Sequence, residues 1–170
     1  MSEVNTVLPS MRVDGQIALV TGAGRGIGKG CALALAEAGA EVIAMARTAS
    51  EIDDVVAEIQ AKGGKARAVV CDVADQAAMT AAFAGIDRLD ILVNNAGFSP
   101  KKNWLEYEIS EWQKVLDVNL SGEFFGARAV AEHMMERRSG RIINMSSSSW
   151  RHGGVASGGG MPYVSSKAGV

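Results

Sequence analysis

The sequence predicts an α/β protein built on a doubly wound parallel sheet. Short apolar runs alternate with longer segments of helical composition along almost the whole chain. This order implies parallel strands joined by helical crossovers, with helices on both faces of the sheet. The chain has 170 residues, of which 48% are hydrophobic and 21% charged, as in a globular protein with one core. We expect a tail over residues 1–14 and one domain over 15–170.

The first half of the chain carries three strand predictions and three helix predictions. Gly39 and the pair Gly63-Gly64 each follow a helical segment, as glycines that end helices do. Asp75 is suited to cap the third helix, because a carboxylate accepts hydrogen bonds from free backbone N–H groups. The predicted strands are 17–20, 41–46 and 66–71, and the predicted helices are 27–38, 51–61 and 75–83.

The second half continues the alternation with a strand at 89–93. Ser110 and Gln113 have capping-box spacing, which predicts a long helix from there to about Arg138. A strand at 141–145 and a Gly/Ser-rich stretch at 146–160 follow. Pro162 suits the first turn of a last helix.

Several classes of function are disfavoured by the composition. A net charge of -2 and a pI of about 5.7 give no clustered basic surface for nucleic acid. His133 and His152 are the only histidines and neither has ligand-like neighbours, so no metal is expected. The start of the chain lacks a signal-peptide pattern, and no run of 18 apolar residues predicts a membrane span. We expect a cytoplasmic protein.

A glycine-rich turn follows the first strand, in the stretch Thr21-Gly22-Ala23-Gly24-Arg25-Gly26-Ile27-Gly28. Its spacing is T-G-x-x-x-G-x-G, and neither G-x-G-x-x-G nor a P-loop fits. Glycines let the backbone approach a pyrophosphate, while N–H groups at the helix start face its charge. The alternative is a tight strand–helix turn without a ligand. The position after the first strand of a βα series favours the dinucleotide site.

Further motifs stand at the predicted strand ends and at the start of the last helix. They are Asp72-Val73, Asn94-Asn95-Ala96-Gly97, Asn119 within D-V-N-L, Ser146-Ser147 at the end of I-N-M-S-S, and Tyr163 with Lys167 in Y-x-x-x-K. Together with the glycine turn, this series resembles the short-chain dehydrogenase/reductase family, with 3-oxoacyl-carrier-protein reductase-like character. The resemblance covers Asp14 to Val170 and implies a Rossmann fold.

Two departures from the family pattern stand out. Members of the family normally continue past the last helix with at least one more helix and strand, so we expect a sheet that lacks its C-terminal strand and helices. We therefore expect the functional protein to have more residues than this chain. The spacing of 16 between Ser147 and Tyr163 is also longer than in many members. We expect the loop 150–160 to absorb the difference.

The resemblance implies four catalytic residues. Tyr163 and Lys167 are four apart and share a helix face, and an ammonium favours the phenolate form of a nearby tyrosine. Tyr163 is then the general acid/base, and Lys167 also holds the nicotinamide ribose. Ser147 would polarise the substrate carbonyl. Asn119 would hold a water linked to the lysine, the alternative being an ordinary polar residue inside a helix.

The same resemblance implies a set of cofactor-binding residues at the strand ends. Asp72 is placed to bind the adenine amino group, with helix capping as its competing role. Asn94 and Gly97 lie where the backbone passes close to the cofactor, and both also suit a plain turn. The full set is Gly22, Arg25, Gly26, Ile27, Gly28, Arg47, Thr48, Asp72, Val73, Asn94, Ala96, Gly97, Tyr163 and Lys167.

The end of the second strand favours NADP, with NAD as second choice. An acidic residue there binds the ribose hydroxyls of NAD, and in this family the acid commonly falls where this chain has Ala46. Arg47 follows, and its guanidinium suits a 2′-phosphate. Thr48 could add a hydroxyl, and Arg25 projects towards the same pocket in NADP-preferring members. The alternative is that both arginines are solvated, with Glu51 or Asp53 pairing with Arg47.

The sequence thus predicts an oxidoreductase that transfers a hydride between NADP(H) and a small-molecule carbonyl or secondary alcohol. The alternatives are a cofactor-binding protein without turnover and an NAD-dependent sugar-alcohol dehydrogenase. By resemblance we expect a homotetramer or homodimer, formed through the long helix at 111–138 and the last helix, without nucleic-acid or membrane partners.

Overall fold

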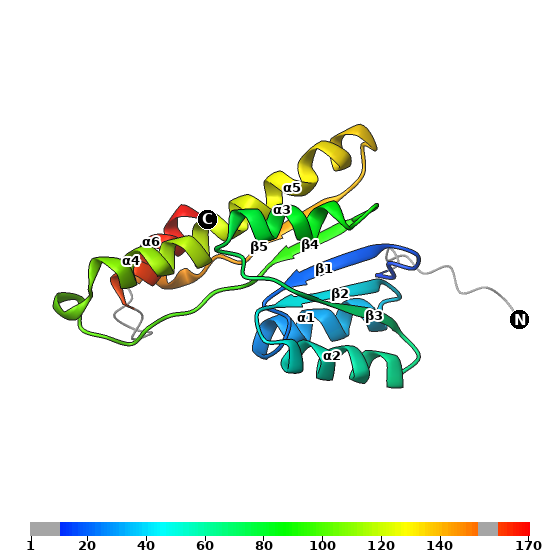
Figure 1. The fold of residues 1–170 in the computed structure, drawn as a ribbon, viewed down its shortest axis with the longest axis horizontal. Helices are drawn as coiled ribbons and strands as arrows, with labels where there is room; N and C mark the ends of the chain where they lie inside the picture. Colours follow the sequence, from blue (N-terminus) through cyan, green and yellow to red (C-terminus); the bar gives the residue numbers. More distant parts are fainter. Residues whose placement is uncertain (1–10, 153–159) are drawn as a thin grey trace, which may run out of the picture.

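The structure is a computed structural model that describes residues 11–152 and 160–170, so most of the expected tail and most of the loop 150–160 lie outside the described residues. The described part forms a five-stranded parallel sheet in the order β3-β2-β1-β4-β5 (Figure 1). The chain adds β2 and β3 on one side of β1, and β4 and β5 on the other side, so the direction in which successive strands are added reverses between β1 and β4. The strands are β1 (Ile17–Thr21), β2 (Glu41–Ala46), β3 (Lys65–Val70), β4 (Ile91–Asn94) and β5 (Arg141–Asn144).

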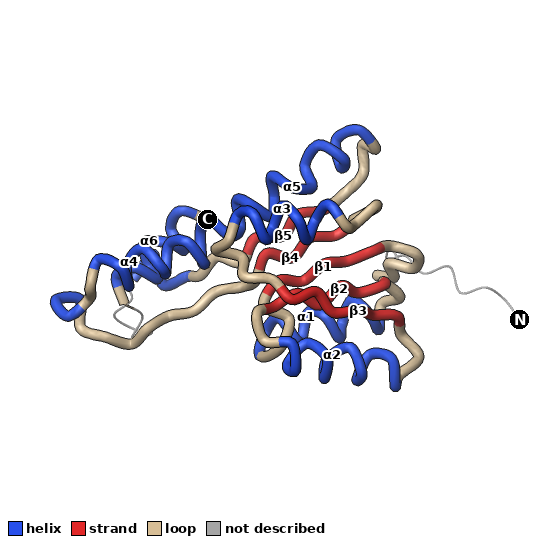
Figure 2. Tube along the Cα trace, in the orientation of Figure 1, coloured by secondary structure: helices blue, strands red, loops and turns tan. Residues whose placement is uncertain are grey.

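Helices cover both faces of the sheet, as the alternation of strands and helices predicts (Figures 1 and 2). Helices α1 and α2 lie on one face, and α3 and α5 lie on the other, while α4 and α6 pack together beyond the carboxyl ends of the strands. The helices are α1 (Gly26–Glu37), α2 (Ala49–Ala61), α3 (Gln76–Ala84), α4 (Ile109–Leu116), α5 (Gly122–Glu136) and α6 (Met161–Gly169), with short 3-10 helices at Trp104–Glu106 and Ser148–His152.

The strands supply alternate residues to two apolar layers, because successive side chains of a strand point to opposite faces. Val20 and Val42 pack on the side of α1 and α2, together with Ile52 and Val55 of α2. Leu19 lies on the other side, in the layer that α3 and α5 cover. All five side chains are completely buried. The sheet is thus held rigidly from both sides, and its carboxyl ends are fixed in space.

The long helix predicted from Ser110 to about Arg138 differs in two ways from the observed one. Helix α4 begins at Ile109 after Glu108, and the Glu111 carboxylate accepts a hydrogen bond from the Glu108 N–H at 2.9 Å. The capping box predicted at Ser110 and Gln113 was therefore wrong by two residues, because a glutamate can also serve as the N-cap. A π-helical turn at Asp117–Ser121 then separates α4 from α5.

The other boundaries agree with the sequence prediction to within two residues. Asp75 caps α3 as expected, since its Oδ1 accepts a hydrogen bond from the Ala78 N–H at 3.0 Å. Strand β5 pairs only with β4 among the described strands, and its Ile142 and Ile143 are exposed. Among the described residues, β5 forms one edge of the sheet. Within the described ranges, no helix is long and apolar enough to cross a membrane.

Candidate active site

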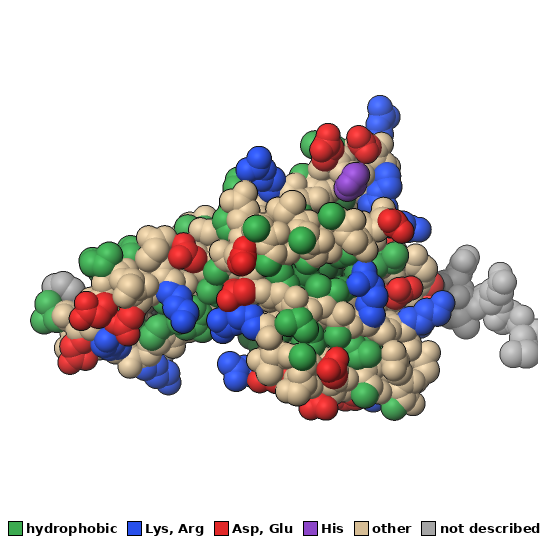
Figure 3. Space-filling model, in the orientation of Figure 1, with side chains coloured by type: hydrophobic (Ala, Val, Ile, Leu, Met, Phe, Trp, Pro, Cys, Tyr) green, Lys and Arg blue, Asp and Glu red, His purple; other side chains and the backbone are tan. Residues whose placement is uncertain are grey.

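A cavity of about 530 Å³ lies at the carboxyl ends of the strands, on both sides of the reversal between β1 and β4. Its walls come from the glycine turn, the segments after β2, β3 and β4, the end of β5 and the first turns of α6. In Figure 3 this face of the molecule is hollowed between the lobe of α4 and α6 and the layer of α1 and α2. Ligands of open parallel sheets bind at this kind of position.

The glycine turn between β1 and α1 leaves no room for side chains at Gly22 and Gly28. Gly22 and Gly26 have φ angles of +65° and +56°, which favour glycine. A Cβ on Gly28 would lie 2.2 Å from the Gly22 carbonyl oxygen, and one on Gly22 would lie 2.9 Å from the Ala96 Cα. The turn therefore brings bare backbone to the cavity at the start of α1, where unpaired N–H groups face outward.

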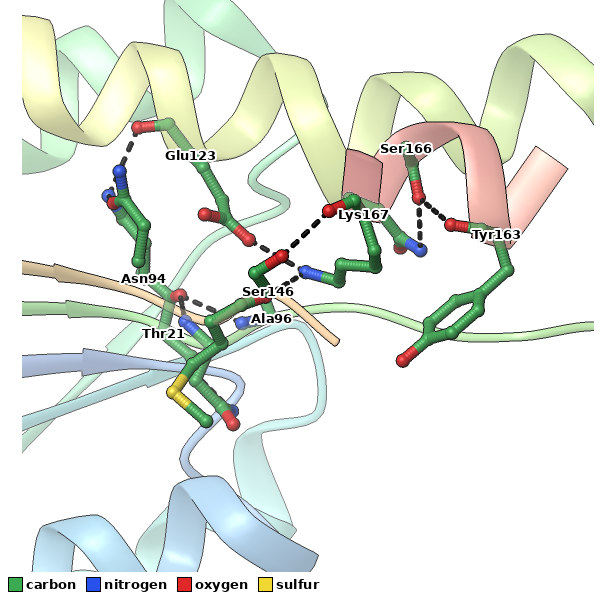
Figure 4. Close-up of polar contacts among 12 residues, drawn as sticks. Thr21, Asn94, Ala96, Glu123, Ser146, Tyr163, Ser166 and Lys167 are labelled. Atoms are coloured by element: carbon green, nitrogen blue, oxygen red, sulfur yellow. Dashed lines mark hydrogen bonds and ion pairs between the residues drawn. The ribbon is translucent and has the colours of Figure 1, made fainter. Parts of the chain in front are cut away.

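Thr21 ties this turn to the segment after β4. Its Oγ1 accepts hydrogen bonds from the N–H groups of Asn95 and Ala96, both at 3.0 Å, and Asn95 Nδ2 donates to the Thr21 carbonyl at 2.9 Å (Figure 4). Asn95 lines the cavity although it was not among the predicted site residues. The repeated asparagine was the available signal, because only one of two adjacent strand-end side chains can face the cavity.

Asn94 points away from the cavity, into the protein. Its side chain is 1% exposed, and Nδ2 donates to the Glu123 carbonyl and to Asn144 Oδ1, both at 3.0 Å. Gly126 of α5 makes room for it, since a Cβ there would meet Asn94 Oδ1 at 2.5 Å. Asn94 thus joins α5 and β5 to the end of β4.

Two cationic side chains lie beside the end of β2. Arg47 is 58% exposed and places Nη1 3.5 Å from Asp72 Oδ2, while Arg25 is 85% exposed and lies 3.8 Å from Glu51. Arg47 therefore pairs with Asp72, whereas Glu51 serves Arg25. Such exposed pairs contribute little free energy and separate easily. Both arginines are thus available to an anionic ligand at the cavity mouth.

The turn after β3 supplies Asp72 and Cys71. Asp72 Oδ1 accepts a hydrogen bond from the Ala74 N–H at 3.0 Å, which closes the turn and leaves Oδ2 towards Arg47. Cys71 is buried in the cavity wall, and burial raises the pKa of its thiol, with the Asp72 charge adding to the effect. An uncharged Cys71 forms a small apolar patch there.

Lys167 of α6 reaches the floor of the cavity and is 4% exposed. Its Nζ donates to the carbonyl oxygen of Met145 and to Glu123 Oε1, the latter at 2.8 Å (Figure 4). Glu123 of α5 is 5% exposed, and burial raises the pKa of its carboxyl while the bond from Lys167 opposes that rise. Sequence reasoning missed Glu123, because a glutamate on a long helix is usually solvated.

Tyr163 lies one turn before Lys167 on α6 and also lines the cavity. Figure 4 shows both side chains descending from α6 towards the strand ends. Ser166 Oγ donates to the Tyr163 carbonyl at 2.7 Å, and Ser146 Oγ donates to the Lys167 carbonyl at 2.7 Å. The first bond lies within α6, and the second joins α6 to the segment after β5. Ser146 lines the cavity, whereas Ser147 is half-buried beside it, with its Oγ accepting from the Ser149 N–H at 3.2 Å.

Asn119 lies in the π-helical turn and is completely buried. Its amide exchanges two hydrogen bonds with the backbone of Phe98, at 3.0 and 2.9 Å, and Nδ2 also donates to Ser166 Oγ at 3.2 Å. The side chain thus connects the segment after β4 with α6. Asn119 thus lies in a π-helical turn and not in a regular α-helix. Such turns are frequent at functional sites.

The structure brings most of the predicted site residues to one cavity. Those that line it are Gly22, Arg25, Gly26, Ile27, Gly28, Arg47, Thr48, Asp72, Val73, Ala96, Gly97, Tyr163 and Lys167. Asn94, Asn119 and Ser147 lie outside its lining. Within residues 11–152 and 160–170, no cluster of His, Cys, Asp or Glu could hold a metal ion.

Comparison with known proteins agrees with this geometry. Residues 16–170 match the family model described as short chain dehydrogenase. The chain is 44% identical over 161 residues to a 3-oxoacyl-[acyl-carrier-protein] reductase from Synechocystis, covering 91% of this chain and 64% of that protein. It is 40% identical to a 2-dehydro-3-deoxy-D-gluconate 5-dehydrogenase from Pseudoalteromonas atlantica, covering 96% of this chain and 65% of that protein.

Solved structures show the same likeness. The crystal structure of a gluconate 5-dehydrogenase from Burkholderia cenocepacia J2315, in complex with NADP and tartrate, superposes with a TM-score of 0.84 at 37% identity. That match covers 94% of this chain and 63% of the other. This chain therefore spans slightly less than two thirds of the length of these relatives. By its sequence match and its fold, the chain belongs to the short-chain dehydrogenase/reductase family.

Proposed function

We propose that the protein transfers a hydride between NADP(H) and a carbonyl or secondary alcohol. The observation that carries this proposal is the placement of Tyr163 and Lys167 on one wall of the cavity, with the glycine turn on the other. A proton-transfer group and a dinucleotide cradle thus share one space. Family membership supports the same class of reaction.

The glycine turn fits the pyrophosphate of a dinucleotide. A Cβ on Gly28 would fall into the backbone of Gly22, so this position requires glycine and keeps the turn tight at the start of α1, where an anion can approach the backbone. The N-terminus of α1 carries no acidic side chain in its first turn to repel that anion. A bound nicotinamide would supply the hydride chemistry.

Tyr163 is assigned the role of general acid/base. Its half-buried ring lines the cavity, and the buried Lys167 lies one turn later on the same helix. Ser147 is assigned to hydrogen-bond the substrate oxygen. It lies beside the cavity lining rather than in it, so this role requires its hydroxyl to turn towards the substrate. Asn119 is assigned to support proton transfer through Lys167, and its hydrogen bond to Ser166 Oγ on the same helix as Lys167 supports this assignment.

NADP is the proposed cofactor because of the residues after β2. Ala46 lines the cavity where an acid would favour NAD, and Arg47 and Thr48 follow it in the same wall. Among the described residues, the exposed guanidinium of Arg47 makes one ion pair, a long one with Asp72 at 3.5 Å. A 2′-phosphate would compete well for that group, because it offers a higher charge and bidentate geometry. The Burkholderia relative with bound NADP supports the choice.

The experiment that tests the proposal is a panel of substrates with NADPH and NADH, followed by nicotinamide absorbance. The relatives suggest two substrate classes, 3-oxoacyl thioesters and keto acids derived from sugars. We expect NADPH-dependent reduction of at least one class. Full activity with NADH alone would contradict the cofactor assignment, and absence of turnover with every carbonyl would contradict the reaction.

Binding of the cofactor without turnover is a second candidate. The position of Ser147 outside the cavity lining favours it, since catalysis needs that hydroxyl at the substrate. A titration of NADPH fluorescence separates the two candidates. Tight NADPH binding together with no activity on the whole panel would support the binding protein.

Assembly into a homotetramer or homodimer remains a prediction. Phe124 on α5 is 58% exposed, which supports an interface on that helix. Measurement of the mass in solution tests it, and a monomer at working concentration would contradict it. Cytoplasmic location also remains a prediction, which fractionation of the source cells would test.

A further inference from the structure

Glu123 and Lys167 form an ion pair that is buried at the floor of the cavity. Each side chain is 5% exposed, and Lys167 Nζ lies 2.8 Å from Glu123 Oε1. In this pair one partner belongs to the catalytic helix and the other to α5. Figure 4 shows the Glu123 carboxylate reaching from α5 towards the Lys167 ammonium.

The backbone at Glu123 is fixed in place. Its carbonyl oxygen accepts a hydrogen bond from Asn94 Nδ2 at 3.0 Å, and Gly122 packs so closely on Val73 that a Cβ would lie 2.9 Å from Val73 Cγ2. Helix α5 therefore presents the carboxylate from a rigid position against β4. A carboxylate held in this way can determine where the ammonium lies.

The second oxygen of Glu123 has no partner. Oε2 is buried and makes no hydrogen bond in the described residues. An unpaired buried carboxylate oxygen is costly, and buried ion pairs are often no more stabilising than apolar residues of similar volume. Apolar residues at both positions would serve the local fold as well as the pair does, which points to a role of the pair in function.

The hydrogen bonds of the ammonium suggest that role. A lysine ammonium has three N–H donors. Glu123 takes one and the Met145 carbonyl takes another, which leaves one for the cavity that Lys167 lines. Asp72, on a neighbouring segment, is paired with Arg47. Among the described residues, Lys167 is the charged group that acts on the Glu123 carboxylate.

We propose that Glu123 is a positioning residue, whose carboxylate holds the Lys167 ammonium at the cavity floor with one N–H directed to the bound ligand. This rests on the proposed function, in which Lys167 acts on Tyr163 and on the cofactor ribose. Without the carboxylate the ammonium keeps its bond to Met145 but loses its second anchor. Its long flexible side chain then samples positions from which it supports Tyr163 less well.

The test compares Glu123→Gln and Glu123→Asp in the full-length protein. Gln keeps the size and one acceptor but removes the charge, whereas Asp keeps the charge on a shorter side chain. Glu132→Gln is the matched control, because Glu132 is an exposed glutamate on the same helix. Steady-state kinetics with NADPH and the best substrate of the panel give kcat and the cofactor KM separately.

We expect Glu123→Gln to lower kcat about tenfold or more and to raise the cofactor KM less than threefold. In the proposed complex the lysine would provide one of several hydrogen bonds to the dinucleotide, and it is the cation closest to Tyr163 along α6. Glu123→Asp should recover at least threefold of the lost kcat, and Glu132→Gln should match the parent. Equal kcat in the Gln variant and the parent, or no recovery with Asp, would overturn the proposal.

A spectroscopic measurement keeps this inference separate from the proposed function. Lysine ammonium groups labelled with ¹⁵N give NMR signals when they are shielded from exchange with water. We expect one such signal in the parent, lost in Lys167→Met and in Glu123→Gln, and kept in Glu132→Gln. A signal that persists in Glu123→Gln would overturn the positioning role even if the enzyme is active.

The same signal decides the matter if no substrate is turned over, since it does not require catalysis. If Glu123→Gln does not fold, the Asp variant decides. Retention of the ammonium signal and of more than a third of the parent kcat supports the role of the charge, and loss of both contradicts it.

Discussion

Replacing Ala46 with aspartate tests the cofactor preference at a single position. Ala46 is the last residue of β2 and lines the cavity directly before Arg47. The new carboxylate could accept hydrogen bonds from the ribose hydroxyls of NAD, and it would repel a 2′-phosphate. It would also compete for Arg47, which pairs with Asp72 at 3.5 Å. We expect weaker NADPH binding and unchanged or tighter NADH binding.

The magnitude follows from the exposure of this site. Arg47 is 58% exposed, so the surroundings are water-like and charges are strongly screened. Two unit charges about 5 Å apart in water interact by about 0.8 kcal/mol, and a phosphate carrying close to two charges doubles that value. A repulsion of about 1.7 kcal/mol corresponds to an approximately 20-fold larger dissociation constant for NADPH.

The assay is titration of each reduced cofactor by fluorescence, in the parent and in the variant. Ala57→Asp is the control, because it adds the same charge at an exposed position of α2 that does not line the cavity. We expect that control to change NADPH binding less than threefold. If Ala46→Asp binds NADPH as tightly as the parent, the phosphate does not lie beside the end of β2 and the reasoning fails.

Three further predictions concern catalysis, the glycine turn and the base of the sheet. Tyr163→Phe should lower kcat about a hundredfold with little change in NADPH affinity, and a variant that keeps most of its turnover would refute the role of the hydroxyl. Gly28→Ala should weaken dinucleotide binding at least tenfold, because the new Cβ would lie 2.2 Å from a backbone oxygen. In Gly30→Ala the new Cβ meets nothing within 4 Å, so this variant should bind normally and gain about 0.5–1 kcal/mol of unfolding free energy. Equal binding by the two variants would contradict the role of the glycine turn in binding the dinucleotide. Burial opposes ionisation of Asp90, but bonds from the Ile17 N–H and two arginines outweigh it and hold its pKa below the ordinary value of 3.8. The stabilisation by ionised Asp90 is therefore present above pH 3.8 and is lost as pH falls through the lowered pKa. Asp90→Asn should therefore cost about 2–4 kcal/mol of unfolding free energy at pH 7 and weaken the fall of Tm at acidic pH. An equal fall of Tm with pH in both proteins would count against this role of Asp90.

The alternation of apolar runs and helical segments was sufficient to predict the sheet, because the two-residue period of strands and the order βαβ are local properties of the sequence. Spacing was equally sufficient for the glycine turn, since only bare backbone fits where Gly22 and Gly28 meet. It was also sufficient to place Tyr163 and Lys167 on one helix face. These features depend on residues that are close together in the chain.

Features that depend on distant residues needed the tertiary structure. The sequence could not tell which of Asn94 and Asn95 faces the cavity, because that depends on how β4 sits between β1 and α5. It could not show that Asp72, rather than Glu51, pairs with Arg47. Glu123 looked like any helical glutamate until packing against β4 buried it beside a lysine 44 residues away. Burial and long-range pairing arise from the whole fold, so only the folded chain reveals which charged side chains have left the solvent.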